Sequence, residues 1–245
     1  MKINKKKVFV AALIVCALAL ITTGTLAWFN DSAEVVNKFH VADSDNNGTP
    51  NFSIEVKETA YDKDGNKVDA NNDGVYDLTD EGNTYFTVAP GDVLPKDPVV
   101  TNTGDYNQWV RVNILISRDF ADQVAEAQGL TVVPGTAPAI DMYQLFKDFN
   151  AGNIFDANES NATALTDYYI YAYYYKDILK PRETLPVFTA LNIPSVFTQA
   201  DMNYGTDGFQ IIVKAEAVQS DNIAGPAYTA FTSIANWPIG TAYGA

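Results

Sequence analysis

The chain has 245 residues, of which 30 are acidic and 16 basic, and its net charge at pH 7 is −14. This balance excludes nucleic acid as an expected partner, because phosphate backbones are bound by a basic footprint. It suits a soluble extracellular protein or one that collects divalent cations. The length allows one large all-β domain or two small ones.

The N-terminus has the pattern of a secretory signal peptide. Four lysines within the first seven residues precede an unbroken apolar run over residues 8–21. As a helix this run would span about 21 Å, short of the ~30 Å membrane core. Thr25 and Ala27 supply the small residues at the −3 and −1 positions. The pattern therefore predicts cleavage between Ala27 and Trp28.

Two other interpretations of the N-terminus stay open. The segment acts as an uncleaved anchor if the apolar stretch is extended to Phe29. Lipidation at Cys16 would need a small residue before the cysteine, where Val15 stands. Cys16 is the only cysteine, so a chain cut after Ala27 has no disulfides. That mature chain keeps 12 basic against 30 acidic residues, a net charge of −18.

Residues 28–42, directly after the predicted cut, have the alternation of an extended strand with one apolar face. This face carries Phe29, Ala33, Val35, Phe39 and Val41. Asp31 and Asn37 interrupt it. The pattern alone leaves open whether the strand pairs within its own subunit or with a neighbouring one.

Residues 69–80 have the ligand spacing of a calcium loop. The candidate ligands at positions 1, 3, 5, 7, 9 and 12 are Asp69, Asn71, Asp73, the carbonyl of Val75, Asp77 and Asp80. Gly74 stands at position 6, where the loop needs a sharp turn. No flanking helices are evident, and the same residues also favour an acidic hairpin turn. Residues 43–48 repeat only the first part of this spacing.

Period-two alternation through the rest of the chain predicts antiparallel, half-buried strands. The expected strands are residues 52–58, 85–90, 97–104, 109–117, 167–177 and 210–218. Helical spacing predicts two short helices, at 118–128 and at 141–149, the second capped by Asp141. The last 25 residues favour an edge strand or a loose tail. The expected fold is an all-β, jelly-roll-type antiparallel β-sandwich with short helical insertions, preceded by a helical signal peptide.

Four stretches, in this order, resemble the TasA/camelysin family. They are GTLAWFND (24–31), APGDVLPKDPVVTNTGDYNQWVRVNI (89–114), YYYKDILKPRETLPVFTALNIP (173–194) and FQIIVKAEAVQ (209–219). The family consists of secreted Gram-positive proteins with a dedicated type of signal peptide. One departure is Arg182, which stands where the family usually has the glycine of Lys-Pro-Gly-Glu.

The resemblance implies a secreted structural subunit of biofilm matrix fibres, located in the extracellular matrix or at the cell surface. It implies that residues 28–42 add as a donor strand to the next subunit after cleavage, by β-augmentation. The domains would be a signal peptide (1–27), this strand (28–42) and a β-sandwich (43–245) with an acidic inserted loop at 60–83. Expected partners are further copies of the chain, the family's signal peptidase, an accessory fibre protein, and the membrane only before cleavage.

Camelysin has been described as a metalloprotease, so the resemblance also raises the possibility of catalysis. A zinc protease needs two or three His, Glu or Asp ligands and a general base. His40 is the only histidine, and the chain has neither H-E-x-x-H nor G-x-S-x-G. We therefore expect no catalytic residues, with calcium at 69–80 as the candidate cofactor. The alternatives are a monomeric calcium-binding surface or adhesion protein and a camelysin-like metalloprotease.

Overall fold

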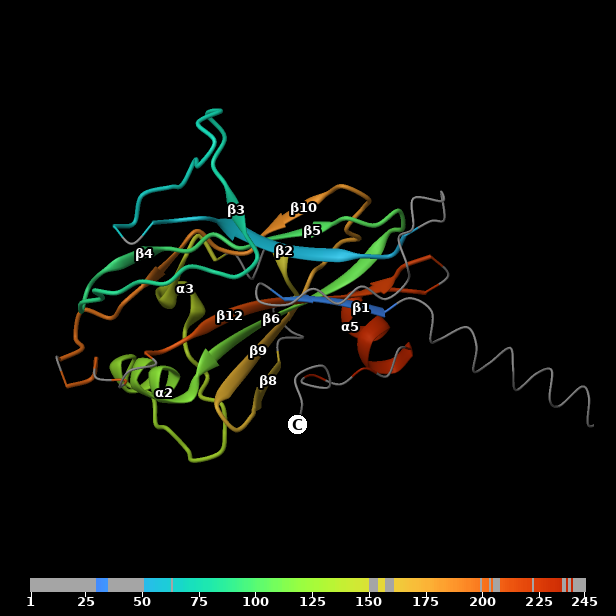
Figure 1. The fold of residues 1–245 in the computed structure, drawn as a ribbon. Coiled ribbons are helices and arrows are strands. Elements are labelled where there is room, and N and C mark those ends of the chain that lie inside the picture. The colour runs from blue at the N-terminus through green and yellow to red at the C-terminus, as the bar shows by residue number, and fades with distance from the viewer. Residues whose placement is uncertain are drawn as a thin grey trace, which may run out of the picture.

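The expected all-β class is confirmed by the computed structural model, in which antiparallel strands form three sheets (Figure 1). The structure describes residues 30–34, 51–62, 64–149, 154–156, 161–198, 200–202, 204, 208–221, 223–234, 237 and 239, and for 30–34 it describes the backbone. The predicted helical signal peptide, residues 1–27, lies outside the described residues.

The largest sheet has five strands and joins the first strand of the chain to the last one. Its strands, in spatial order, are β1 (Asn30–Glu34), β12 (Ile211–Gln219), β6 (Gln108–Ser117), β9 (Tyr168–Tyr174) and β8 (Asn161–Ala164). β6 and β12 pair over nine consecutive positions, from Ile211 opposite Ile116 to Gln219 opposite Gln108. This long pair forms the centre of the sheet.

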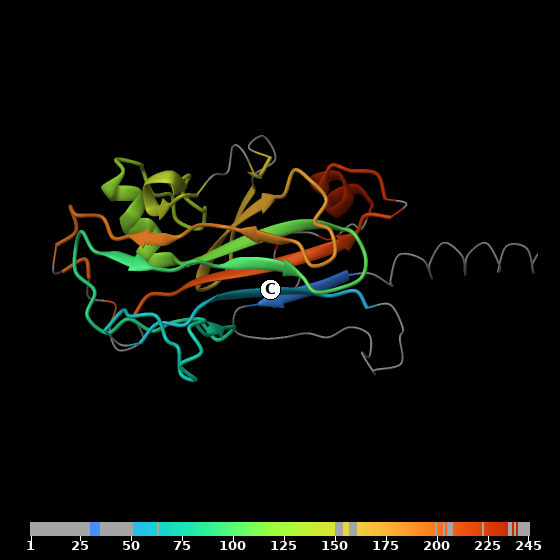
Figure 2. The same cartoon turned by 90° about the horizontal axis from the view of Figure 1, so that it is seen from above.

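Two smaller sheets lie beside the first one (Figures 1 and 2). One contains β10 (Thr184–Pro186), β5 (Val99–Asn102), β2 (Ile54–Thr59) and β3 (Leu78–Thr79). The other contains β4 (Val93–Pro95), β11 (Ala190–Asn192) and β7 (Phe146–Lys147). Because β2 and β5 contribute to the same buried cluster as β6 and β12, the four-stranded and five-stranded sheets enclose one core.

The core follows the alternation read from the sequence. Val110, Val112, Ile114 and Ile116 of β6 are fully buried, as is Val56 of β2. Successive side chains of a strand point to opposite faces, so these four residues of β6 share one face. Four tyrosines of β9 are also buried, which makes them packing residues of the sheet: Tyr169, Tyr171, Tyr173 and Tyr174.

Three expectations about secondary structure need correction. The helix capped by Asp141 is real, and its carboxylate accepts the N–H of Tyr143, but α3 covers only Met142–Leu145 before the chain enters β7. The expected strand at 85–90 is absent from the three described sheets, because the chain turns at Pro90-Gly91, where Gly91 has φ 88°. The other predicted helix is confirmed as α2 (Arg118–Ala127).

The C-terminal region is the third correction, since it is neither an edge strand nor a tail in its described part. It forms α5 (Ala227–Thr229), followed by a π-helical turn, η1 (Ala230–Ile234). Ala227, Ala230 and Phe231 are buried against Trp109 and Tyr174 of the five-stranded sheet. The outer face of this sheet is therefore covered at this point, although its alternation predicted an exposed face.

A buried ion pair lies under this cover. Arg111 of β6 donates from Nε to an oxygen of Glu216 of β12 over 2.6 Å, and both side chains are fully buried. The same oxygen accepts Nδ2 of Asn113 at 2.7 Å. The guanidinium lies 4.6 Å from the ring centroid of Phe231 and donates to the carbonyl of Trp237. Burial by itself would lower the pKa of Arg111, but attraction to Glu216 offsets this and the pKa is raised.

The turn that departs from the family's pattern keeps a conformation that favours glycine. Arg182 has φ 66°, the left-handed region that costs other residues roughly 1–2 kcal/mol. Contacts offset this cost. The N–H of Glu183 donates to the carbonyl of Lys180, and the N–H of Lys180 donates to the carboxylate of Glu183. The guanidinium of Arg182 also donates to the carbonyl of Thr103.

Glu216→Gln is expected to lower the free energy of unfolding by about 3–5 kcal/mol, because it leaves the guanidinium of Arg111 buried without its counter-charge. Urea unfolding of the two proteins measures the difference. The control is Lys57→Met, which breaks a partly exposed pair with Glu55 and should cost at most about 1 kcal/mol. A loss no larger than that of the control would contradict a structural role for the buried pair.

Candidate functional site

The first candidate site is the outer edge of β12, where β1 is bound. The two strands are antiparallel, with Asn30 opposite Val218 and Glu34 opposite Lys214. β1 therefore covers residues 214–218, while β12 itself begins at Ile211. The part of the β12 edge at 211–213 has no partner in β1.

β1 lies at the boundary between two sheets. It is an edge strand of the five-stranded sheet, with β8 at the other edge. It also lies against β2 of the four-stranded sheet, as both views show (Figures 1 and 2). This short segment therefore closes one side of the sandwich.

Only one predicted assembly residue falls within β1. Ala33 is paired with Ala215, whose side chain is fully buried in the core. The other four predicted assembly residues lie outside the described part of the chain, as do both residues of the predicted cut. These residues are Phe29, Val35, Phe39, Val41, Ala27 and Trp28.

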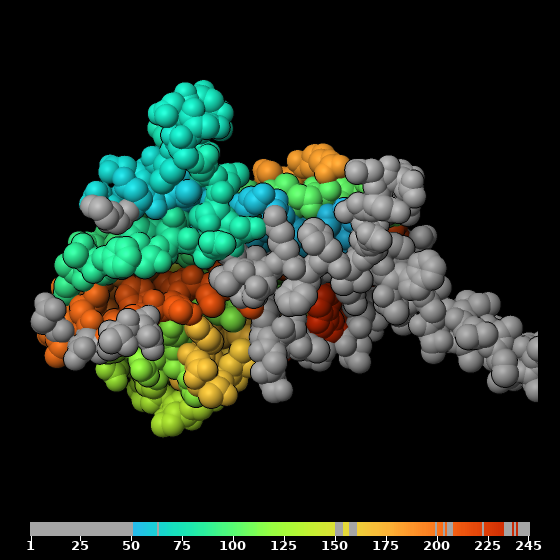
Figure 3. Space-filling model, in the orientation of Figure 1, coloured from blue at the N-terminus to red at the C-terminus, as the bar shows by residue number. Residues whose placement is uncertain are grey.

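The second candidate site is the acidic loop between β2 and β3, which projects from the body of the protein (Figure 3). At its base, the N–H of Ala60 donates to the carbonyl of Asp77 and the N–H of Val68 donates to the carbonyl of Ala60. Further out, the ammonium of Lys67 lies 4.9 Å from the ring centroid of Tyr76. The loop is therefore a folded extension with backbone bonds of its own.

Within this loop the predicted calcium ligands bind backbone N–H groups. The carboxylate of Asp69 accepts the N–H groups of Asp73 and Gly74, at 3.2 and 3.0 Å. The carboxylate of Asp77 accepts the N–H of Ala70, and that of Asp73 accepts the N–H of Val75. Gly74 has φ 84°, which provides the sharp turn expected at position 6.

These contacts are the ones expected of an acidic hairpin turn. Asn71 donates to Asp73, and Asp80 follows β3 at the end of the loop. Throughout the described part of the chain, no three His, Cys, Asp or Glu side chains gather closely enough to hold a metal ion. The shorter acidic stretch at 43–48 and His40 lie outside the described residues.

Peptidase chemistry would need a metal centre of another kind. A catalytic zinc needs three protein ligands and an open position for water. The described residues do not offer such a set. Among them there is also no helix with both the length and the apolar character needed to cross a bilayer.

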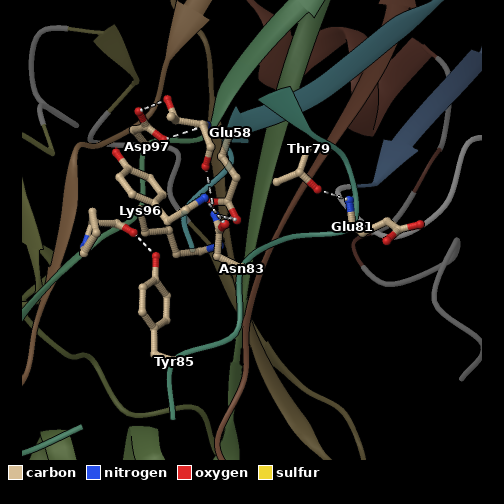
Figure 4. Close-up of polar contacts among 10 residues, drawn as sticks. Glu58, Thr79, Glu81, Asn83, Tyr85, Lys96 and Asp97 are labelled. Carbon is tan, nitrogen blue, oxygen red and sulfur yellow. Dashed lines mark hydrogen bonds and ion pairs between the residues drawn. The ribbon is translucent and has the colours of Figure 1, made fainter. Parts of the chain in front are cut away.

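A buried polar network at the base of the acidic loop was missed by the sequence analysis (Figure 4). Glu58, at the end of β2 and 1% exposed, accepts Nζ of Lys96 at 3.0 Å through one oxygen. Its other oxygen accepts Nδ2 of Asn83 at 3.1 Å. Beside it, the carboxylate of Asp97 accepts both the N–H and the hydroxyl of Thr59, at 2.9 and 2.7 Å.

Two tyrosines border this network. The N–H of Tyr61 donates to Oδ1 of Asn83 at 2.7 Å, and the hydroxyl of Tyr85 donates to the carbonyl of Pro95. Burial, together with nearby carboxylates, raises the pKa of both phenols, so they remain neutral at physiological pH. The only sequence signal was that Lys96 lies within a stretch shared with the TasA/camelysin family.

The chain is similar to one known protein family. Residues 2–166, more than half of the chain, match the family model described as camelysin metallo-endopeptidase. A search of curated proteins and a search of solved structures each found no match.

Asp97→Ala is expected to lower the free energy of unfolding by about 1–3 kcal/mol, because two donors of Thr59 lose a charged acceptor. Limited proteolysis should also cut the acidic loop faster, since Thr59 lies at its base. Urea unfolding and peptide mapping measure the two effects. Glu81→Ala, which removes an exposed carboxylate from the same region, is the control. Equal cleavage of both variants would contradict the fastening role of Asp97.

Proposed function

The chain belongs to the family described as camelysin metallo-endopeptidase, and we propose that within it the protein acts as a structural subunit. It is secreted, and it assembles into extracellular fibres of a biofilm matrix. Assembly occurs when residues 28–42 of one subunit add as a strand to the β12 edge of the next. The observation that carries this proposal is the pairing of β1 with β12, which joins the N-terminal segment to the last described strand along the chain.

Pairing of terminal strands supports exchange between copies. A strand at a sheet edge is held by main-chain hydrogen bonds, which an identical strand from another copy provides equally well. β1 is only five residues long and is separated from β2 by the stretch 35–53. When β1 of a second copy binds in its place, only the few contacts of this short strand are lost, and the new strand makes the same contacts again.

The length of the β12 edge supports a longer strand in the assembled state. If the register of β1 is continued, Val35 falls opposite Val213, which is fully buried. The following residues would then pair with the first part of β12. Edge strands that remain unpaired are templates for such addition.

Cleavage at the predicted site would start assembly. β1 begins at the third residue after Ala27, so the strand cannot reach another subunit while the signal peptide stays in the membrane. The family's signal peptidase would then start polymerisation by releasing the segment. The membrane is a partner only before this step, and an accessory fibre protein is a further candidate partner.

Electron microscopy of purified residues 28–245, beside the same protein without residues 28–42, tests the proposal. We expect fibres only when the segment is present, because the acceptor edge alone has no strand to receive. Fibres from both proteins would contradict strand addition. Monomers from both would favour the alternative of a monomeric calcium-binding surface or adhesion protein.

Val35→Asp should block polymerisation and leave the subunit folded, because it places a carboxylate opposite the buried Val213 in the continued register. The matched control is Val36→Asp, the same substitution one position along, where a strand presents its other face. Light scattering follows polymerisation and circular dichroism follows folding. Fibres formed by Val35→Asp at the rate of the control would contradict this register.

We also propose calcium at residues 69–80, where it would stiffen the acidic loop. The positive φ of Gly74 and the convergence of Asp69 on the N–H groups of Asp73 and Gly74 support a calcium-loop turn. Binding would require the aspartates to exchange some of these bonds for the ion.

Asp73→Ala should abolish any rise in the melting temperature on addition of calcium, since it removes the ligand at position 5. Glu81→Ala, outside the loop positions, should keep that rise. Differential scanning calorimetry with calcium and with chelator measures it. Equal stabilisation of both variants by calcium would place the binding site elsewhere.

Peptidase activity is the second candidate function, favoured by the description of the family alone. It predicts zinc bound in stoichiometric amount and cleavage of casein by the purified chain. Metal analysis and a casein assay on residues 28–245 distinguish it from the structural role. Zinc-dependent cleavage that survives repurification would contradict a purely structural function.

A further inference from the structure

We propose that the side chains of Lys96 and Asn83 become joined by an amide bond, formed by the protein itself with Glu58 as the proton carrier. This is a modification site at the base of the acidic loop, independent of strand exchange. All three side chains lie in the buried polar network (Figure 4).

The reacting groups are held by one carboxylate. Oε2 of Glu58 accepts Nζ of Lys96 at 3.0 Å, and Oε1 accepts Nδ2 of Asn83 at 3.1 Å. The attacking nitrogen and the leaving nitrogen are thus bound to the two oxygens of the same group. Positioning of this kind lowers the activation barrier, because the two groups do not have to find each other by diffusion.

The surroundings favour the amine reaction over hydrolysis. Glu58 is 1% exposed and Lys96 is 9% exposed. Bulk water therefore reaches the carboxylate poorly, and proton exchange occurs between the groups that touch it. A positioned carboxylate within hydrogen-bond reach of both nitrogens has the geometry of a general acid–base.

The amide of Asn83 is also oriented as an electrophile. Its Oδ1 accepts the N–H of Tyr61 at 2.7 Å. Its Nδ2 donates to the carbonyl of Thr59 at 2.9 Å as well as to Glu58. A backbone N–H aimed at the amide oxygen polarises the carbonyl and stabilises the negative charge that develops there during attack.

The reaction balances without a cofactor or an oxidant. Glu58 takes a proton from the ammonium of Lys96, and the neutral Nζ attacks Cγ of Asn83. The oxyanion forms at Oδ1, opposite the N–H of Tyr61. Glu58 returns the proton to Nδ2, the Cγ–Nδ2 bond breaks and ammonia leaves, taking up the remaining proton in water as ammonium. One C–N bond forms and one C–N bond breaks.

Such a bond would supply a covalent connection that the mature chain has no thiols to make. It would close the segment between residues 83 and 96 into a ring, and this segment lies between β3 and β5 and contains β4. It would also fasten the end of the acidic loop to the body of the sandwich, next to Glu58 in the last part of β2.

Intact-mass spectrometry of the secreted chain is the test. We expect a mass lower than the sequence mass by one molecule of ammonia, and digestion should yield a branched peptide that joins Asn83 to Lys96. A mass equal to that of the unmodified sequence would overturn the proposal without any variant.

Three variants exclude other sources of the mass change. Lys96→Arg keeps the charge beside Glu58 but removes the nucleophile, and Glu58→Gln removes the proton carrier, so both should show the full mass. Lys57→Arg, on the neighbouring part of β2, should still lose ammonia. Ammonia loss that persists in Lys96→Arg would indicate cyclisation at Asn83 alone and would overturn the proposal.

Discussion

The nine-residue antiparallel pairing of β6 with β12 is the constraint on which the rest of the structure depends. One face of this pair carries the sandwich core, and the other carries the buried pair of Arg111 and Glu216. β9 continues the sheet from β6, and β1 continues it from β12. The C-terminal helical turn packs over Arg111, whose guanidinium lies against the ring of Phe231 and donates to the carbonyl of Trp237. The acceptor edge of the proposed assembly therefore belongs to a strand that is paired over its full length with β6.

Local patterns predicted the elements better than the contacts between them. Period-two alternation located the long strands, and the single carboxylate of Asp141 marked the start of α3, because both signals lie within a few residues. The burial of Arg111 could not be predicted in this way, since its cover comes from residues around 231 and 237. For the same reason the contact between Glu58 and Lys96, 38 positions apart, could not be predicted.

The family description and the described site chemistry point in different directions. A metallo-endopeptidase needs carboxylates or imidazoles that converge on an ion, whereas three carboxylates in the described part of the chain bind other groups. Asp69 binds backbone N–H groups, Asp97 binds Thr59, and Glu216 binds Arg111. These contacts use negative charge to fix loops and strands. In this protein, part of the acidity serves the architecture of the fold.

The direction of β1 also determines how the molecule would resist force. Its five pairs with β12 lie side by side along the strand. A pull along the strand axis from the Glu34 end loads all of their hydrogen bonds in shear, so that they must break together. A pull across the sheet would instead peel them apart one at a time. A chain of subunits linked in this way would be strong under tension along its length and easy to dismantle from the side.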